Sequence, residues 1–269
     1  MRYILLPFIA LTIFLSATPS SAHRGEAWNG KVVVEIVSDS GSRFHTIPHR
    51  DFRRGGTKII KRYLEAWSGE NYSIVIRNNT PERIGLVIAV DGRNIISGKK
   101  SRLKNNESMY IINGYGHSKL DGWRTDNSTV HRFYFTDPND SYTKRTFNDT
   151  SAMGVIAVAV FREKDKPTPL FENRERKNTP AAPSEAAPRS KSGQSGDDTA
   201  GTGFGDGKYS LVVKVQFEPE SMPAQKTLIK YEWREVLCTK GILKCRPKPG
   251  NRLWGEDDFA PYPPGYPNN

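Results

Sequence analysis

The sequence predicts an all-β fold: an antiparallel β-sandwich, followed by a disordered linker and a short C-terminal arm closed by a disulfide. Residues 28–163 are rich in Val, Ile, Tyr and Phe, and turn-forming residues recur roughly every 8 to 12 positions, a spacing typical of sandwiches. Apolar and polar residues alternate along several short runs, and no long stretch has helical periodicity. These observations indicate about nine short strands in two packed sheets.

Four runs are interpreted as strands from their side-chain pattern. Residues 72–77, 131–136 and 211–218 alternate with a period of two, which is typical of a half-buried strand. The fourth run, residues 59–67, has apolar spacing that also fits one face of a helix. Its β-branched pair and the neighbouring strands favour a strand.

Two further runs indicate how the middle of the chain is arranged. Residues 84–90 and 93–96 flank Asp91 and Gly92. An Asp-Gly pair between two β-rich runs predicts a tight hairpin, because both residues tolerate positive φ. Residues 154–161 are apolar throughout and too few to cross a bilayer, so they predict a central strand covered on both faces.

The composition divides the chain after the sandwich domain, which is placed at residues 23–165. Residues 166–207 are rich in Pro, Ala, Ser and Gly and are predicted to form a disordered linker. Within it, the glycine run at 201–207 is interpreted as a flexible hinge, because it leads into a strand and not into the helix N-terminus of a phosphate-binding loop. Residues 208–250 are expected to complete the sandwich and to carry the disulfide loop, followed by a proline-rich tail at 251–269.

Residues 1–22 are predicted to be a signal peptide that is removed on export. Arg2 provides a positive start, and residues 4–15 form an apolar core of the length that export signals use. Ser20 and Ala22 place small residues at the −3 and −1 positions, which predicts cleavage after Ala22. A spanning helix would need about 20 apolar residues, so no transmembrane segment is expected in the mature protein. The predicted location is therefore periplasmic or secreted.

The mature chain is strongly basic. The signal peptide holds one of the 40 Lys and Arg residues and none of the 29 Asp and Glu residues, which leaves a net charge near +10. Such a chain is attracted to polyanions. The positive residues are scattered and never form a run of five, so specific nucleic-acid binding is not expected. An anionic or glycan surface component is the kind of partner that we expect.

The two cysteines, Cys238 and Cys245, are predicted to form a disulfide. Two thiols are too few for a structural zinc site, and redox-active pairs usually have the spacing Cys-x-x-Cys. In an oxidising compartment, a disulfide that closes this small loop is the simplest interpretation. Gly241 at the centre of the loop permits the tight turn that closure requires.

The segment Asp-Gly-Trp-Arg-Thr-Asp at residues 121–126 is interpreted as a loop and is the main candidate for a binding site. A Trp beside an Arg in a Gly-containing turn is suited to stacking on a sugar or base and to clamping an anion. In the alternative interpretation, Trp123 covers the edge of the sandwich and Arg124 pairs with a neighbouring acid. Three more residues are candidates for the same surface: Tyr115, His117 and Tyr134.

No catalytic or cofactor motif is recognised. The sequence contains no Gly-x-Ser-x-Gly, His-Glu-x-x-His or P-loop motif, so no catalytic residue and no cofactor are assigned. His23, the expected first mature residue, offers amine and imidazole nitrogens to copper, but such a site needs further histidines. His45 and His49 have helical spacing that Pro48 interrupts, so no metal ligands are assigned.

A series of longer motifs follows in order over most of residues 60–250. They are VDGRNIISG at 90–98, DGWR at 121–124, RFYFT at 132–136, DSY at 140–142, SAMGVIAVAV at 151–160, GTGFG at 201–205 and IKYEWRE at 229–235. In these motifs the chain resembles a family of uncharacterised exported proteins of Gram-negative bacteria. The resemblance implies a secreted or periplasmic β-rich protein, and no activity, substrate or catalytic residue carries over from it.

The main functional hypothesis from the sequence is a non-catalytic exported module that binds an unidentified ligand or has a structural role. The alternative hypothesis is an exported enzyme or metal-binding protein. In that case either copper binds at His23 or a carbohydrate-active site includes Trp123.

Overall fold

The computed structural model describes residues 32–164 and 199–245, which form fourteen strands in two seven-stranded sheets. The first sheet contains β1 (Val32–Ser38), β4 (Asn71–Asn78), β8 (His117–Leu120), β9 (Gly122–Arg124), β10 (Thr129–Thr136), β12 (Gly201–Thr202) and β13 (Gly207–Tyr209). The second contains β2 (Thr46–Arg54), β3 (Thr57–Ala66), β14 (Gln225–Trp233), β11 (Val155–Arg162), β5 (Ile84–Val90), β6 (Arg93–Asn94) and β7 (Tyr110–Ile112). The helices are a 3-10 turn, η1 (Pro138–Asp140), and two short α-helices, α1 (Tyr142–Phe147) and α2 (Arg234–Thr239).

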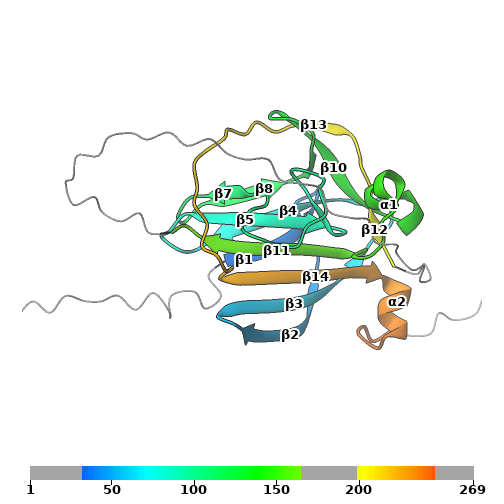
Figure 1. The fold of residues 1–269 in the computed structure, drawn as a ribbon. Coiled ribbons are helices and arrows are strands. Elements are labelled where there is room, and N and C mark those ends of the chain that lie inside the picture. Colours follow the sequence, from blue (N-terminus) through cyan, green and yellow to red (C-terminus); the bar gives the residue numbers. More distant parts are fainter. Residues whose placement is uncertain (1–31, 165–198, 246–269) are drawn as a thin grey trace, which may run out of the picture.

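The two sheets pack together, which confirms the predicted sandwich (Figure 1). The strands expected at residues 59–67, 72–77 and 131–136 are present as β3, β4 and β10. Among the described strands, one pair is parallel: β14 runs beside β3 with Gln225 opposite Lys58. Because β14 also pairs with β11, the C-terminal part of the chain supplies a central strand of the second sheet. None of the described helices is long and apolar enough to cross a membrane.

The predicted Asp-Gly hairpin and the predicted central strand are both present. Asp91 and Gly92 have φ of 47° and 79° and join β5 to β6, with Val90 opposite Arg93. β11 lies between β5 and β14 and is buried over most of its length. Its inward residues enter the main core, whereas Ala159 and Phe161 pack on the other face against Leu103 and Met109. The second covered face explains why this run is apolar throughout.

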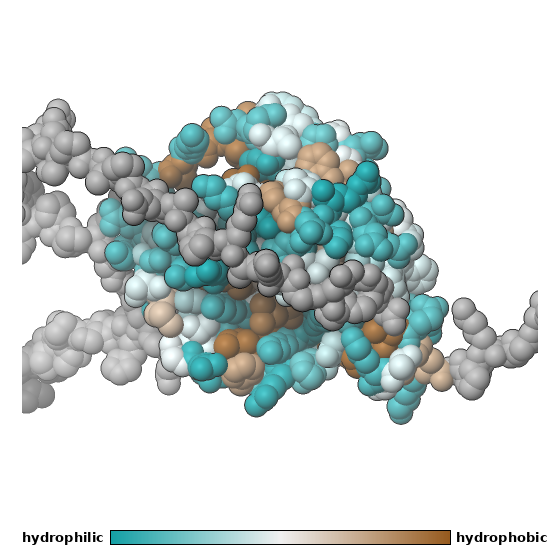
Figure 2. All heavy atoms as spheres, turned by 45° about the vertical axis from the view of Figure 1, so that its right-hand side comes forward, coloured by the Kyte–Doolittle hydropathy of each residue, from teal (hydrophilic) through white to brown (hydrophobic). Residues whose placement is uncertain are grey.

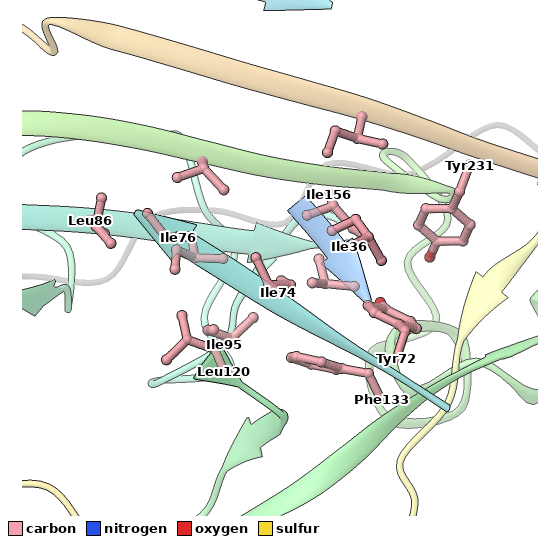
Figure 3. Packing of buried hydrophobic residues seen from close by; sticks show 14 of the residues in the cluster. Ile36, Tyr72, Ile74, Ile76, Leu86, Ile95, Leu120, Phe133, Ile156 and Tyr231 are labelled. Carbon is pink, nitrogen blue, oxygen red and sulfur yellow. The ribbon is translucent and has the colours of Figure 1, made fainter. Parts of the chain in front are cut away.

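The core between the sheets is centred on β4 and β10. The Tyr72 ring stacks on Phe133 and Phe135, with ring centroids 5.3 and 4.4 Å apart. Figure 3 shows Tyr72 and Phe133 among core residues from both sheets. These are the aliphatic residues Ile36, Ile74, Ile76, Leu86 and Ile156, and Tyr231 of β14. Alternate residues of each strand therefore form one continuous core, as period-2 patterning requires.

The prediction of a strand at residues 211–218 is wrong. This segment connects β13 of the first sheet to β14 of the second and has no strand partner. Leu211 and Val213 are 64% and 77% exposed. The Val212 N–H donates to the Asn127 carbonyl at 2.8 Å, which holds its beginning. Alternation predicts an extended backbone, but a strand also needs a neighbour. Figure 2 shows surface hydrophobic residues in separate areas among hydrophilic ones.

The linker boundary at residue 207 is also wrong. Residues 201–202 form β12, paired with Thr136 and Phe135 of β10, and both are buried. A Cβ on Gly203 would overlap the Tyr134 ring, and a Cβ on Gly201 would meet the Ser141 side chain at 2.7 Å. The glycines therefore allow this segment to lie flat against β10. They do not form the predicted hinge.

The C-terminal arm contains the predicted disulfide. Cys238 and Cys245 are bonded, with their Cα atoms 5.6 Å apart. Gly241 has φ of 68°, as expected for a tight turn. Leu237 of α2 is fully buried, and its carbonyl accepts hydrogen bonds from the N–H groups of Ile242 and Leu243. The disulfide loop is thus attached to the body of the sandwich.

Several predictions concern residues outside the described ranges. These are the signal peptide with its cleavage site after Ala22, the copper candidate His23, the linker over residues 166–198 and the proline-rich tail at 251–269.

Candidate functional site

Trp123, the main candidate from the sequence, is a buried strand residue. The predicted loop at 121–126 contains strand β9, in which Trp123 lies opposite His131. Its side chain is 2% exposed, and its indole N–H donates to the Gly203 carbonyl at 3.0 Å. The ring packs edge-on against Phe133, with centroids 5.4 Å apart. This geometry fits the alternative interpretation, in which Trp123 has a packing role.

Arg124 has a full set of protein partners. Its Nε donates to the Tyr110 hydroxyl at 2.7 Å, and its Nη atoms donate to the backbone oxygen and hydroxyl of Ser210 at 2.9 and 3.0 Å. A further bond reaches the carbonyl of Asp126 at 3.1 Å. These contacts join β9 to the segment that follows β13. An incoming anion would have to compete with four existing hydrogen bonds.

Of the other three sequence candidates, Tyr115 and His117 lie at the beginning of β8, and Tyr134 lies at the other end of β4. Tyr115 is 74% exposed in a turn where its φ is 56°. His117 is exposed on β8, opposite Arg77 of β4. Tyr134 lies on β10, where its ring packs against Gly203. The structure therefore does not bring these side chains together around Trp123.

The histidines of the described ranges do not assemble a metal site. His45 and His49 are exposed near the beginning of β2, and His131 contacts the Gly205 carbonyl through Nδ1 at 2.9 Å. Over residues 32–164 and 199–245, no group of three or more His, Cys, Asp or Glu side chains is positioned to hold a metal ion.

A buried polar network ties β12 to the rest of the fold. The Asp91 carboxylate accepts hydrogen bonds from the Tyr231 hydroxyl at 2.5 Å and from the N–H groups of Gly154 and Thr202, both at 2.8 Å. The Thr202 hydroxyl in turn contacts the hydroxyls of Tyr231 and Tyr72, at 2.6 and 2.8 Å. Burial raises the pKa of Asp91 to about 6. Because all these groups are buried, we assign them to the core and not to a ligand site.

A cleft of about 410 Å³ opens at one end of the sandwich. Three parts of the chain form it: the β1–β2 connection, the β3–β4 turn and the disulfide loop, which contributes Leu243. None of the five candidates from the sequence lines this cleft. Its volume lies within the range of small-molecule sites, about 300 to 1,000 Å³.

The most exposed large hydrophobic side chain of the cleft is that of Trp67. It follows directly after Ala66, the last residue of β3, which is buried. Because successive side chains point to opposite faces, Trp67 turns outward and is 58% exposed. The N–H of Glu70 closes the following turn on the Trp67 carbonyl at 3.0 Å, with Gly69 at φ of 79°. The turn thus holds an indole ring at the cleft without covering it.

The apolar wall of the cleft is fixed by the core. Phe44 contacts Phe135 edge-on, with ring centroids 5.5 Å apart, and its N–H donates to the Ile36 carbonyl at 2.9 Å. Ile47 and Leu243 extend this wall. Since Phe135 is fully buried, the wall is continuous with the packed interior and is preformed.

Hydroxyl groups line another side of the cleft. The hydroxyls of Ser38 and Ser40 are 2.8 Å apart, and the Ser40 hydroxyl donates to that of Ser42 at 3.1 Å. The Ser38 N–H donates to the Ser42 carbonyl at 2.8 Å, which closes the turn that presents them. A hydroxyl both donates and accepts, so this row matches a ligand that also carries several hydroxyls.

Four residues of the cleft are charged or titratable, and two of these, Glu65 and Arg43, already have partners. Arg234 Nη1 donates to both carboxylate oxygens of Glu65, at 3.0 and 3.1 Å, and Arg43 pairs with Glu35 at 3.0 Å. The Glu70 carboxylate and the His45 ring line the cleft without a side-chain partner among the described residues. These two groups are therefore available to a ligand.

Comparisons of the chain with known proteins found no relative. No family model, curated protein or solved structure matches the chain.

Sequence reasoning missed the cleft because its residues are far apart in the chain. Serines before β2, a Trp after β3 and Leu243 near the C-terminus meet only through the strand order β2-β3-β14. One local signal was present: a Trp followed by Ser-Gly-Glu at the end of an alternating run. A Trp in the position after a strand, immediately before a turn, does not have to enter the core.

Proposed function

We propose that this protein is an exported, non-catalytic binding module that holds a glycan in the cleft at Trp67. The observation that carries the proposal is the 58% exposure of an indole ring on the wall of a preformed cleft. Large aromatic side chains are usually buried, and an exposed one beside a concavity favours a ligand.

The composition of the cleft supports a sugar as the ligand. The C–H faces of a pyranose pack on an indole ring, while its hydroxyls need both donors and acceptors. The serine row, His45 and Glu70 provide such groups beside Trp67. Phe44 and Ile47 form an apolar wall, as small-molecule sites usually have.

The ion pairs support binding over hydrolysis. Glycoside hydrolases use two carboxyl groups, one of which must exchange a proton during the reaction. Of the two carboxylates in the cleft, Glu65 is occupied by two hydrogen bonds from Arg234. Glu70 alone remains for ligand contacts, which suits a hydrogen-bond acceptor in a binding site.

Export to the periplasm or medium belongs to the same proposal. It is supported by the signal-peptide pattern of residues 1–22 and by the Cys238–Cys245 disulfide, because disulfides persist mainly in oxidising compartments. Removal of residues 1–22 is checked by N-terminal sequencing of protein recovered from the periplasm. A mature chain that still begins at Met1 would contradict this part of the proposal.

The glycan proposal is tested by isothermal titration with soluble peptidoglycan fragments and neutral β-glucan oligosaccharides. Wild-type protein should bind at least one of these probes, and Trp67→Ala should lose binding by at least about tenfold. Tyr115→Ala is the matched control, because it removes an exposed aromatic ring that lies outside the cleft. Binding equal to wild type in Trp67→Ala, or loss only in Tyr115→Ala, would refute the site.

Chromatography of the same mixtures distinguishes binding from catalysis. Oligosaccharides that bind should be recovered intact after long incubation. Shortened products that disappear in Glu70→Gln would show an enzyme and would favour the alternative functional hypothesis.

A further inference from the structure

The β2–β3 hairpin concentrates a large part of the positive charge of the protein. Residues 46–66 contain six Lys and Arg residues and two acidic residues, Asp51 and Glu65. The basic residues are Arg50, Arg53, Arg54, Lys58, Lys61 and Arg62. Six positive and two negative residues give this one hairpin a net charge of +4, about two fifths of that of the mature chain.

At least three of these six cations have no ion-pair partner among the described residues. Asp51 is taken up by Arg62, whose Nη2 donates to Oδ2 at 2.9 Å. Within the described ranges, Arg54, Lys58 and Lys61 form no ion pair. The Arg50 guanidinium lies over the Phe52 ring at 5.1 Å, a contact that leaves its charge uncompensated.

The cations are distributed over both faces of the hairpin. Cross-strand partners share a face, so Arg53 and its partner Lys58 lie on one face. Arg50 and its partner Lys61 lie on the other, together with the pair formed by Phe52 and Ile59. The hairpin therefore has positive charge on both sides and an apolar pair on one of them.

The turn at the tip of the hairpin, Gly55 and Gly56, is exposed. Gly55 and Gly56 form the turn, with φ of 55° and 81°, and a Cβ on either would have no neighbour within 4 Å. Figure 1 shows β2 and β3 at the lower edge of the fold, beyond the strands of the facing sheet. The exposed residues 53–56 can thus contact a partner at this edge of the molecule.

Protection of an exposed sheet edge does not account for this charge. Charged residues on an edge strand discourage pairing with other chains, and β2 is such a strand. However, Lys58, Lys61 and Arg62 lie on β3, which is already paired with β2 on one side and with β14 on the other. Half of the cations are therefore on a strand that needs no protection.

We propose that the tip of the β2–β3 hairpin docks on the surface of an anionic lipid bilayer. A bilayer surface surrounds an inserted tip with phosphates, so it contacts cations on both faces at once. Each Lys or Arg near such a surface is attracted by the negative surface potential of the anionic lipids. Phe52 and Ile59 lie two to three residues from the turn, where their side chains reach the boundary between headgroups and acyl chains.

The same contacts disfavour a nucleic acid as the partner. Single-stranded nucleic acid binds by stacking bases on exposed aromatic faces along one groove. Here the Phe52 face is occupied by Arg50, and Tyr63 is in an edge contact with His49, with ring centroids 5.1 Å apart. A groove would also gather the cations on one face, whereas the hairpin divides them between two.

This surface is separate from the glycan cleft. The cleft lies where β2 begins and β3 ends, and the tip lies eight or nine residues away along both strands. At roughly 3.3 Å per residue, the separation is about 25 to 30 Å. Lipid docking and glycan binding can therefore be lost independently of each other.

The test is co-sedimentation of the mature chain with lipid vesicles. Wild-type protein should sediment with vesicles of phosphatidylcholine mixed with an equal amount of phosphatidylglycerol, and not with phosphatidylcholine alone. Arg54→Gln/Lys58→Gln should weaken this binding by at least about tenfold. The matched control is Lys99→Gln/Lys104→Gln, which removes the same charge from exposed positions on another loop, and it should bind like wild type. Trp67→Ala should also retain vesicle binding.

Three outcomes would overturn the proposal. Equal loss in the tip and control variants would show that only the net charge matters. Equal binding to neutral vesicles would remove the role of the phosphates. Capture of single-stranded DNA that depends on Arg54 and Lys58, without binding to vesicles, would assign the hairpin to a nucleic acid.

Discussion

Trp123 and Trp67 each lie near a glycine, yet the fold uses them in opposite ways. Gly122 precedes Trp123 inside strand β9, whereas Gly69 follows Trp67 in the turn between β3 and β4. Trp123 is 2% exposed and its indole N–H is hydrogen-bonded; Trp67 is 58% exposed. The residue type and a nearby glycine therefore do not distinguish a core tryptophan from a surface one.

The difference arises from strand position. Trp123 belongs to a strand paired with β10, so its ring faces Phe133 and Tyr142 in the interior. Trp67 is the first residue after β3, and the inward position before it is taken by Ala66. Register, which depends on the partner strand, decides which side chain is buried.

The substitution with the largest expected effect on stability is Trp123→Ala, and it tests the difference between the two tryptophans. Trp123→Ala removes a buried ring and leaves the Gly203 carbonyl without its indole donor. It should lower the free energy of unfolding by about 3 to 5 kcal/mol, as truncation of large aromatic core residues does. Urea unfolding followed by circular dichroism measures this change. A loss below about 1 kcal/mol would contradict the packing role.

The second prediction concerns the buried network that anchors β12 near Trp123. Burial raises the pKa of Asp91 to about 6, whereas an unfolded Asp has a pKa near 4. Between these values the folded protein binds more protons than the unfolded chain. The free energy of unfolding should therefore fall by about 2 kcal/mol as the pH rises from about 4 to about 6.

Asp91→Asn sharpens this prediction. Asn is neutral at every pH, so this contribution to the pH dependence should disappear. The variant should still be less stable than protonated wild type, because one amide N–H would face the N–H of Gly154 or Thr202. Urea unfolding at several pH values gives both quantities. Parallel curves for the two proteins between about pH 4 and 6 would assign the pH dependence to other groups.

The third prediction compares the stability cost of an alanine at Gly122, beside Trp123, with that at Gly69, beside Trp67. A Cβ on Gly122 would overlap the backbone carbonyl of His131 in the neighbouring strand, whereas a Cβ on Gly69 would have no neighbour within 4 Å. Gly122→Ala should therefore cost about 2 to 3 kcal/mol of stability through overpacking. Gly69→Ala should cost about 1 kcal/mol, because only its positive φ is unfavourable. Similar thermal shifts for both variants would contradict the difference in packing.

The sequence predicts those parts of the fold that depend on local patterns. The strands predicted from alternation at β4 and β10 and from the β-branched pair at β3, the Asp-Gly turn after β5 and the short Cys238–Cys245 loop are confirmed. Each of these features is determined by residues close together in the chain, with strong periodicity or special φ requirements.

The predictions that are wrong depend on contacts between distant residues. Residues 211–218 have the pattern of a strand but no strand beside them. Gly201 and Gly203 lie in a glycine run predicted to be a hinge, but they pack against β10. The cleft at Trp67 is of the same kind, because its walls come from three distant segments. Tertiary pairing overrides local propensity in each case.

The smallest expected effect is on stability at Trp67, and it completes the comparison. The ring is mostly exposed, its indole N–H has no hydrogen-bond partner among the described residues, and the turn that follows it is closed by backbone atoms. Trp67→Ala should therefore change the free energy of unfolding by less than about 0.5 kcal/mol, as surface substitutions usually do. The turn bond from the Glu70 N–H to the carbonyl of residue 67 does not need the side chain, so the cleft should keep its shape. Differential scanning calorimetry of Trp67→Ala and Trp123→Ala under the same conditions measures the contrast. A decrease of more than about 2 kcal/mol in the free energy of unfolding of Trp67→Ala would show that this ring also packs in the fold. The exposed ring would then no longer support a ligand site in the cleft.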